Sequence, residues 1–184
     1  MERVTSRVKP IRAAVGLSLL AIIVVACGTP QTATTLVTLG LKAQLAGDLT
    51  TAEDNYVQAI KLDTNNAVAH YDLGTIYDRN GKTSLAVGEY TAALVIDPTF
   101  TDALFNLAVD TAAADPTNAK VLYLKVVSAQ PSFAAAWLNL GFILQAEGDT
   151  SAARTDWSKA VVLDPSLATR VPSARTPAAA TPEP

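Results

Sequence analysis

The feature that most constrains this chain is a five-residue pattern that recurs at a nearly constant interval. Each copy opens on a large residue and closes on Leu-Gly or Leu-Ala, and the ends of successive copies are 34, 34 and 33 positions apart. The copies are Leu36–Gly40, His70–Gly74, Leu104–Ala108 and Trp137–Gly141. A period of this length is typical of proteins built from stacked supersecondary units. The sequence therefore predicts four units, which span residues 33–66, 67–100, 101–133 and 134–167.

Each unit contains two stretches of about 13 residues in which apolar positions recur at helical spacing. A glycine suited to the left-handed end of a helix separates the two stretches in three of the units, at Gly47, Gly81 and Gly148. The third unit has Asp115-Pro116 at this place, a pair that favours the start of a helix. Every unit is therefore predicted to be a helix-turn-helix pair.

Other residues mark helix ends and helix contacts. Thr50 and Glu53 have the spacing of a capping box. Prolines end the second helix in three units, at Asp97-Pro98, Gln130-Pro131 and Asp164-Pro165. Small residues in the first helices should let the paired helices approach closely, and large aromatic residues in the second helices should fill the seam with the next unit. The small residues are Gly40, Gly74, Ala108 and Gly141, and the aromatic residues are Tyr56, Tyr90, Tyr123 and Trp157. The predicted fold class is all-α.

These positions resemble the tetratricopeptide repeat (TPR) family. In that family the first helix carries a large residue, Leu-Gly and an aromatic, and the second helix carries Ala, an aromatic, Ala and Pro. The fourth unit matches at Trp137, Leu140, Gly141, Ala153, Trp157, Ala160 and Pro165. The first unit departs from the pattern at Thr64, where the proline is missing, and the third is one residue shorter at its internal turn. The resemblance implies a short right-handed superhelix of about four repeats that acts in protein–protein interaction.

The first 26 residues have the organisation of an export signal. Residues 1–12 carry four basic side chains and one acidic side chain, whereas residues 13–26 carry no charge. A helix of those 14 residues would span about 21 Å, which is shorter than the roughly 30 Å hydrocarbon core of a bilayer. A basic region followed by a short apolar run is typical of a signal peptide rather than of a stable transmembrane helix.

The end of this segment, Val24–Cys27, resembles the bacterial lipobox. The resemblance implies that Cys27 takes a diacylglycerol and becomes the first residue after cleavage, which would anchor the chain in the cell membrane or outer membrane on the extracytoplasmic side. Residues 1–26 are then a lipoprotein signal peptide, and residues 27–32 are the acylated cysteine and a linker. The alternative is an uncleaved signal-anchor, which also places the rest of the chain outside the cytoplasm.

The carboxy-terminal residues 168–184 are rich in Pro, Ala and Thr. This composition predicts a disordered tail, because closely spaced prolines prevent a long helix. Two alternatives stay open for the end of the last unit. Either residues 167–171 form a short cap, or the last helical face meets a partner.

The composition argues against catalysis and metal binding. One Cys and one His cannot supply a Cys/His zinc cluster, and no Ser or Cys lies in the His and acid context of a nucleophile. The lone histidine, His70, is interpreted as a packing residue, and the acidic residues are spread singly, so no carboxylate pair is expected. Residues 27–184 hold 10 basic and 16 acidic side chains, and this net charge of −6 disfavours nucleic acid. The sequence predicts a protein that is not an enzyme and uses no cofactor or metal.

The first helices of the four units are expected to line a concave groove that binds a peptide. The candidate residues, counted from the Leu-Gly pair, are Tyr71, Asp72, Phe105, Asn106, Leu138, Asn139 and Phe142. The aromatic rings would form a floor, and the polar residues would form a ladder whose amides suit a peptide backbone. The alternative is a purely structural role, because such residues are common inside this repeat.

The resemblance also bears on the kind of partner. TPR proteins that bind the carboxy termini of chaperones hold a carboxylate with Lys, Asn and Arg. Here the corresponding places hold Val37, Leu41, Asp72, Asp102 and Asn106, which disfavours an acidic peptide end. The expected partner is therefore a neutral or basic protein or peptide.

The leading functional hypothesis is a membrane-anchored interaction scaffold or assembly factor in the bacterial cell envelope. The first alternative is a structural protein that associates with itself through the fourth unit. The second alternative is an accessory or targeting subunit of a cell-wall or secretion enzyme system.

Overall fold

The computed structural model describes residues 31–172. This part of the chain forms eight α-helices and one 3-10 helix, and it contains no strand. The helices are α1 (Ala33–Leu45), α2 (Leu49–Leu62), α3 (Ala67–Arg79), α4 (Thr83–Ile96), α5 (Thr101–Thr111), α6 (Pro116–Ala129), α7 (Ala134–Ala146), α8 (Thr150–Leu163) and η1 (Pro165–Thr169). The predicted signal peptide and Cys27 lie outside the described residues, as do residues 173–184 of the predicted tail.

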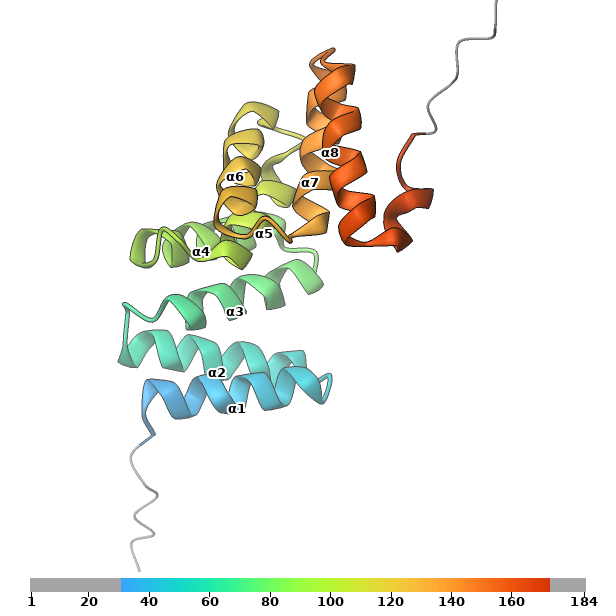
Figure 1. The fold of residues 1–184 in the computed structure, drawn as a ribbon. Coiled ribbons are helices and arrows are strands. Elements are labelled where there is room, and N and C mark those ends of the chain that lie inside the picture. The colour runs from blue at the N-terminus through green and yellow to red at the C-terminus, as the bar shows by residue number, and fades with distance from the viewer. Residues whose placement is uncertain (1–30, 173–184) are drawn as a thin grey trace, which may run out of the picture. The chain divides into compact units, whose positions relative to one another are not determined.

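The helices form four consecutive helix-turn-helix pairs. Each helix packs against the helix before it and the helix after it, so that the second helix of one pair meets the first helix of the next pair (Figure 1). The prediction of an all-α repeat fold is confirmed. Among residues 31–172, no helix is both long enough and apolar enough to cross a bilayer.

The two helices of a pair come together where a small residue faces an aromatic ring. A Cβ atom at Gly40 would lie 2.6 Å from Tyr56 Cε1, and a Cβ atom at Gly74 would lie 2.6 Å from Tyr90 Cε1. A Cβ atom at Gly141 would lie 2.5 Å from Trp157 Cδ1. Real Cβ atoms do not approach so closely, so the helix pairs reach this separation because the first helix lacks a side chain here.

The turns inside the pairs follow the expected chemistry. Gly47, Gly81 and Gly148 have φ values of 82°, 70° and 91°, in the left-handed region that favours glycine. In the third pair, the Asp115 side chain accepts a hydrogen bond from the backbone N–H of Asn118 at 3.0 Å, and Pro116 begins α6. The third unit therefore starts its second helix without the left-handed residue.

The expected capping box in the first unit is wrong. Helix α2 begins at Leu49, and its cap is Asp48, whose carboxylate accepts a hydrogen bond from the backbone N–H of Thr51 at 3.0 Å. Thr50 lies inside the helix, one residue past the start. The left-handed turn at Gly47 places Asp48 directly before the first residue of α2. The Asp48 carboxylate, rather than the Thr50 hydroxyl, therefore caps the free backbone N–H groups of this helix.

The end of the last pair is covered by η1. Leu167 is only 8% exposed and belongs to a buried cluster with Leu138 and Trp157, and Val171 packs against the same cluster. Of the two alternatives for this end, the structure therefore shows a short cap. The boundary expected between residues 167 and 168 falls inside η1, so the ordered part extends beyond the predicted last unit.

Candidate functional site

The predicted groove residues lie on three consecutive first helices. Tyr71 and Asp72 are on α3, Phe105 and Asn106 are on α5, and the other three are on α7. Six of the seven side chains are half-buried. Of the three predicted residues on α7, Asn139 and Phe142 are half-buried, whereas Leu138 is not.

Leu138 is the exception, and its assignment to the groove is corrected. Its side chain is fully buried and packs in the cluster of Trp157 and Leu167. In addition, the Trp157 indole N–H donates a hydrogen bond to the Leu138 carbonyl at 3.2 Å. Because α8 and η1 cover this position, Leu138 is a core residue that cannot touch a ligand in the groove.

The aromatic residues on α3 and α5 pack against rings at the start of the next first helix. The Tyr71 ring lies 4.8 Å from the Phe100 ring, and the Phe105 ring lies 4.7 Å from the Phe133 ring, measured between centroids. Phe100 and Phe133 stand at the starts of α5 and α7, so each pair joins one first helix to the next. These contacts stabilise the stack of units, and they leave less of each ring for a ligand than the sequence suggested.

The two asparagines of the ladder also connect neighbouring units. The Asn106 amide donates to the Tyr90 hydroxyl at 3.3 Å, and the Asn139 amide donates to the Tyr123 hydroxyl at 3.1 Å. Asp72 occupies the matching place in the second unit, and burial raises the pKa of its carboxyl to about 6. One donor of each asparagine is thus used inside the fold, which fixes the orientation of the amide.

Two adjoining cavities run along the first helices, and together we call them the groove. The cavity between α3 and α5 has a volume of about 200 Å³, and the cavity between α5 and α7 has a volume of about 240 Å³. Val109 lines both. Asn106 lines the first cavity, and Asn139 and Phe142 line the second, so the structure brings only the last two of these predicted residues to one cavity. Tyr71, Asp72 and Phe105 line neither cavity.

The cavity between α3 and α5 contains a carboxylate pair that the sequence reasoning missed. Asp78 accepts a hydrogen bond from the Tyr90 hydroxyl at 2.6 Å. The Oδ2 oxygen of Asp110 is buried and has no hydrogen-bond partner within residues 31–172. Burial, together with the charge of Asp78, raises the pKa of the Asp110 carboxyl to about 6. The expectation of singly spread acids is therefore wrong for these two residues.

The repeat register gives no signal for this pair. Asp78 follows the Leu-Gly pair of its unit by four positions, and Asp110 follows the Leu-Ala pair of its unit by two. These offsets differ by two residues, or about 200° around an α-helix, so the register does not place the two side chains on equivalent faces of their helices. The sequence alone does not give the offset between neighbouring helices, which decides that these two side chains meet.

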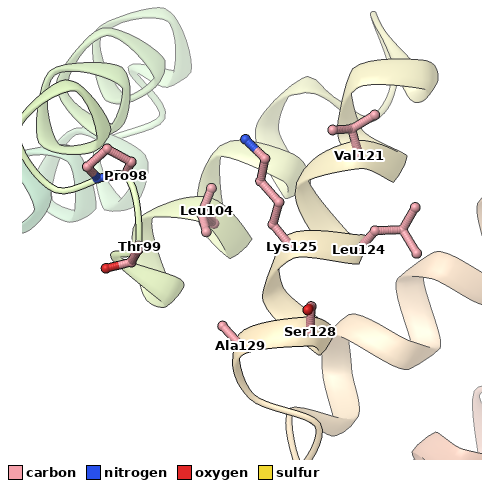
Figure 2. Close-up of a pocket in the computed structure, with 8 residues that line it drawn as sticks. All are labelled: Pro98, Thr99, Leu104, Val121, Leu124, Lys125, Ser128 and Ala129. Carbon is pink, nitrogen blue, oxygen red and sulfur yellow. The ribbon is translucent and has the colours of Figure 1, made fainter.

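A larger cavity lies away from the groove, between the α4–α5 turn and α6. It has a volume of about 540 Å³, and we call it the outer cavity. Figure 2 shows Val121, Leu124 and Lys125 projecting from α6, with Pro98 and Thr99 on the turn. Val121 and Leu124 are 47% and 46% exposed. The sequence reasoning followed the first helices and so did not consider these two apolar residues of a second helix.

The described residues show no arrangement for a metal ion. Within residues 31–172, no group of three or more His, Cys, Asp or Glu side chains is placed to hold one. His70 instead lies against Glu89 of α4, with its Nδ1 atom 2.7 Å from Glu89 Oε2. This contact joins the two helices of the second pair.

Comparison with known proteins agrees with this architecture. Residues 45–81, from the end of α1 to the turn after α3, match the family described as TPR repeat. The crystal structure of MamA superposes with a TM-score of 0.67 at 23% sequence identity, and the match covers 77% of this chain and 83% of MamA. The described residues have the TPR fold. All four helix pairs are therefore described below as TPR units.

Two further comparisons involve named interactions. The first TPR domain of Spaghetti (RPAP3), solved with the HSP90 peptide SRMEEVD, gives a TM-score of 0.59 at 25% identity, covering 64% of this chain and 97% of that domain. The photosystem I assembly protein Ycf3 of Rippkaea orientalis is 33% identical over 73 residues. Those residues are 38% of this chain and 42% of Ycf3, so the match spans less than half of that protein.

Proposed function

We propose that this chain is an interaction scaffold or assembly factor whose groove binds a peptide segment of another protein. The observation that carries the proposal is the continuity of the two cavities along α3, α5 and α7. They combine apolar surface at Val109 and Phe142 with oriented polar groups at Asn106 and Asn139. Such a surface suits an extended segment, which needs apolar contacts for side chains and polar partners for its backbone.

The relatives support the same class of function. One neighbour with this fold was solved with a bound peptide, and one relative is named as an assembly protein. The peptide SRMEEVD is acidic at its end, whereas the groove here carries Asp78 and Asp110 and the predicted exported part has a net charge of −6. The partner we propose is therefore neutral or basic.

We further propose that the scaffold is a lipoprotein of the bacterial cell envelope. This part rests on the resemblance of Val24–Cys27 to the lipobox and on the short apolar run before it. Mass spectrometry of the membrane fraction tests it. The expected species begins at a Cys27 that carries a diacylglycerol. An intact Met1 with an unmodified Cys27 would refute the lipid anchor and favour the uncleaved signal-anchor, and it would leave the groove proposal unaffected.

Matched valine variants test the groove. Val109 in the groove and Val121 in the outer cavity are 46% and 47% exposed, so Val109→Asp and Val121→Asp change similar surfaces equally. The full chain is used for affinity capture from a detergent-solubilised cell envelope. We expect the wild type and Val121→Asp to capture the same protein and Val109→Asp to lose it. If capture were lost with Val121→Asp but not with Val109→Asp, the binding site would be the outer cavity rather than the groove.

A further inference from the structure

The cavity between α3 and α5 holds negative charge at a partly buried place. Asp78 and Asp110 reach it from neighbouring first helices. Asp78 accepts the hydrogen bond of the Tyr90 hydroxyl, but the buried Oδ2 oxygen of Asp110 accepts none from the described residues. Two carboxylates in one such site repel each other unless a proton or a cation joins them. A cation at this place would allow both carboxylates to stay ionised.

The surrounding elements do not provide that cation. Helix α3 contributes Asp78 and Arg79, α4 contributes Tyr90, and α6 contributes Tyr123 to the surroundings of Asp110. Arg79 lines the cavity, but it forms no ion pair with either carboxylate in the described part of the chain. When both carboxyls are ionised the local charge is therefore negative, and its complement is either a proton shared by the two carboxyls or a cation supplied by a ligand.

We propose that this cavity binds the side chain of a lysine or arginine in the peptide that occupies the groove, with Asp78 and Asp110 together holding its cationic end. Val109, which is 46% exposed, provides apolar contact for the aliphatic stem of such a side chain. Carboxylates are the acceptors that ammonium and guanidinium groups bind most strongly. The inference rests on the proposed function, because the peptide backbone has to follow the groove.

A displayed random nonapeptide library is the probe. It is selected against the full-length chain in detergent micelles, and the best peptides are resynthesised with each basic residue replaced in turn by norleucine. Binding is measured to the wild type, to Asp78→Asn/Asp110→Asn, and to Val109→Asp. Asp54→Asn, an exposed acid on α2, is the control for overall charge.

The expected result is one required basic position in the selected peptides. Norleucine at that position should weaken binding to the wild type by about tenfold or more, and it should have little effect with the Asp78→Asn/Asp110→Asn variant. Asp54→Asn should behave like the wild type. The affinity of the wild type should also rise between pH 5 and pH 7.5, because the cation requires an ionised Asp110, and the double variant should lose this dependence.

Two other outcomes are informative in different ways. Peptides that need Val109 but tolerate norleucine everywhere, or that bind the double variant as tightly as the wild type, would refute the cation site and leave the groove intact. Selected peptides that bind Val109→Asp as well as the wild type would refute the groove itself, and the cation site with it.

Discussion

At the scale of single residues, the contact between a small residue and an aromatic ring sets how closely two helices of a TPR unit pack. Tyr90 is fully buried, and its ring occupies the space where a side chain on Gly74 would stand. The same relation joins Gly40 to Tyr56. The sequence predicted the close approach at the small residues but assigned the aromatic rings to the seam with the next unit, whereas in the structure each ring lies against the glycine of its own unit.

Gly74→Ala tests this contact. The added methyl group would overlap the buried Tyr90 ring, and overpacking of this kind destabilises a domain by about 1–3 kcal/mol. Gly88→Ala is the matched control, because Gly88 lies inside α4 with no atom within 4 Å of its Cβ position. The control should gain up to about 1 kcal/mol in helix propensity. Urea unfolding measures the free energy of unfolding of both variants. Equal stability of the two would contradict the close contact between Gly74 and the Tyr90 ring.

Buried carboxyls give the stability a defined pH dependence. Folding raises the pKa of Asp72 and of Asp110 to about 6, whereas an unfolded Asp titrates near 3.9. Between those values the folded chain holds protons that the unfolded chain has released, so the free energy of unfolding falls as the pH rises from about 4 to about 6. Each residue should contribute on the order of 1 kcal/mol after allowance for solvent screening.

Thermal unfolding between pH 4.5 and pH 7.5 checks this prediction. We expect the wild type to be less stable at pH 7.5, and Asp72→Asn/Asp110→Asn to show a flatter profile. A wild type that becomes more stable across this range would contradict the burial of these two carboxyls.

At the scale of helices, most starts and ends follow from local chemistry, and the errors occur where two local signals compete. Asp97, Gln130 and Asp164 end their helices before a proline, as expected. At α2, both Thr50 and Asp48 are possible N-cap residues by sequence. Asp48 is the N-cap in the structure because it directly follows the left-handed turn. The start of a helix is thus decided by the turn that precedes it, and a short sequence pattern did not reveal this.

Asp115→Ala tests the cap that replaces the glycine turn in the third unit. Loss of the hydrogen bond from the Asn118 N–H should destabilise the domain by about 1 kcal/mol. Asp54→Ala removes the same charge inside α2 without removing a cap, so its effect should stay within about 0.5 kcal/mol. Chemical denaturation compares the free energies of unfolding of the two variants. An equal loss of stability would mean that the charge of Asp115, rather than its capping hydrogen bond, stabilises the domain.

The candidate site was less predictable than the helices, because it depends on the geometry between units. Three of the residues proposed from the repeat register, Asn106, Asn139 and Phe142, line the cavities of the groove, and their use in binding stays a prediction. The register could not show that Leu138 is covered by η1, because η1 has no counterpart after the second helix of the first three units. It also could not show that Asp78 meets Asp110, because that contact depends on the offset between α3 and α5.

At the scale of the whole molecule, the described units share one stack that is closed at its carboxy-terminal end by a short cap. The buried cluster of Leu138, Trp157 and Leu167 lies on the face of the fourth unit against which a fifth unit would otherwise pack. Tyr71 and Phe105, at the positions equivalent to Leu138, pack instead on aromatic residues at the start of the first helix that follows each of them. The cap therefore substitutes for a neighbouring unit.

Leu167→Ala tests the cap. Removing this buried side chain should destabilise the domain by about 2 kcal/mol or more and uncover the face of the fourth unit. Leu163→Ala is the control, since Leu163 is 43% exposed. Analytical ultracentrifugation should show that only Leu167→Ala associates with itself as concentration rises. A stable monomeric Leu167→Ala variant would show that η1 is not needed to close the stack.

The central claim is that a peptide binds along the first helices of the TPR units, and site-specific photo-crosslinking in living cells tests it most directly. A photoreactive amino acid is placed at Val109 in the groove or at Val121 in the outer cavity, two residues of nearly equal exposure. The account predicts an adduct with a distinct protein from position 109 and none from position 121. An adduct from position 121 alone would contradict it.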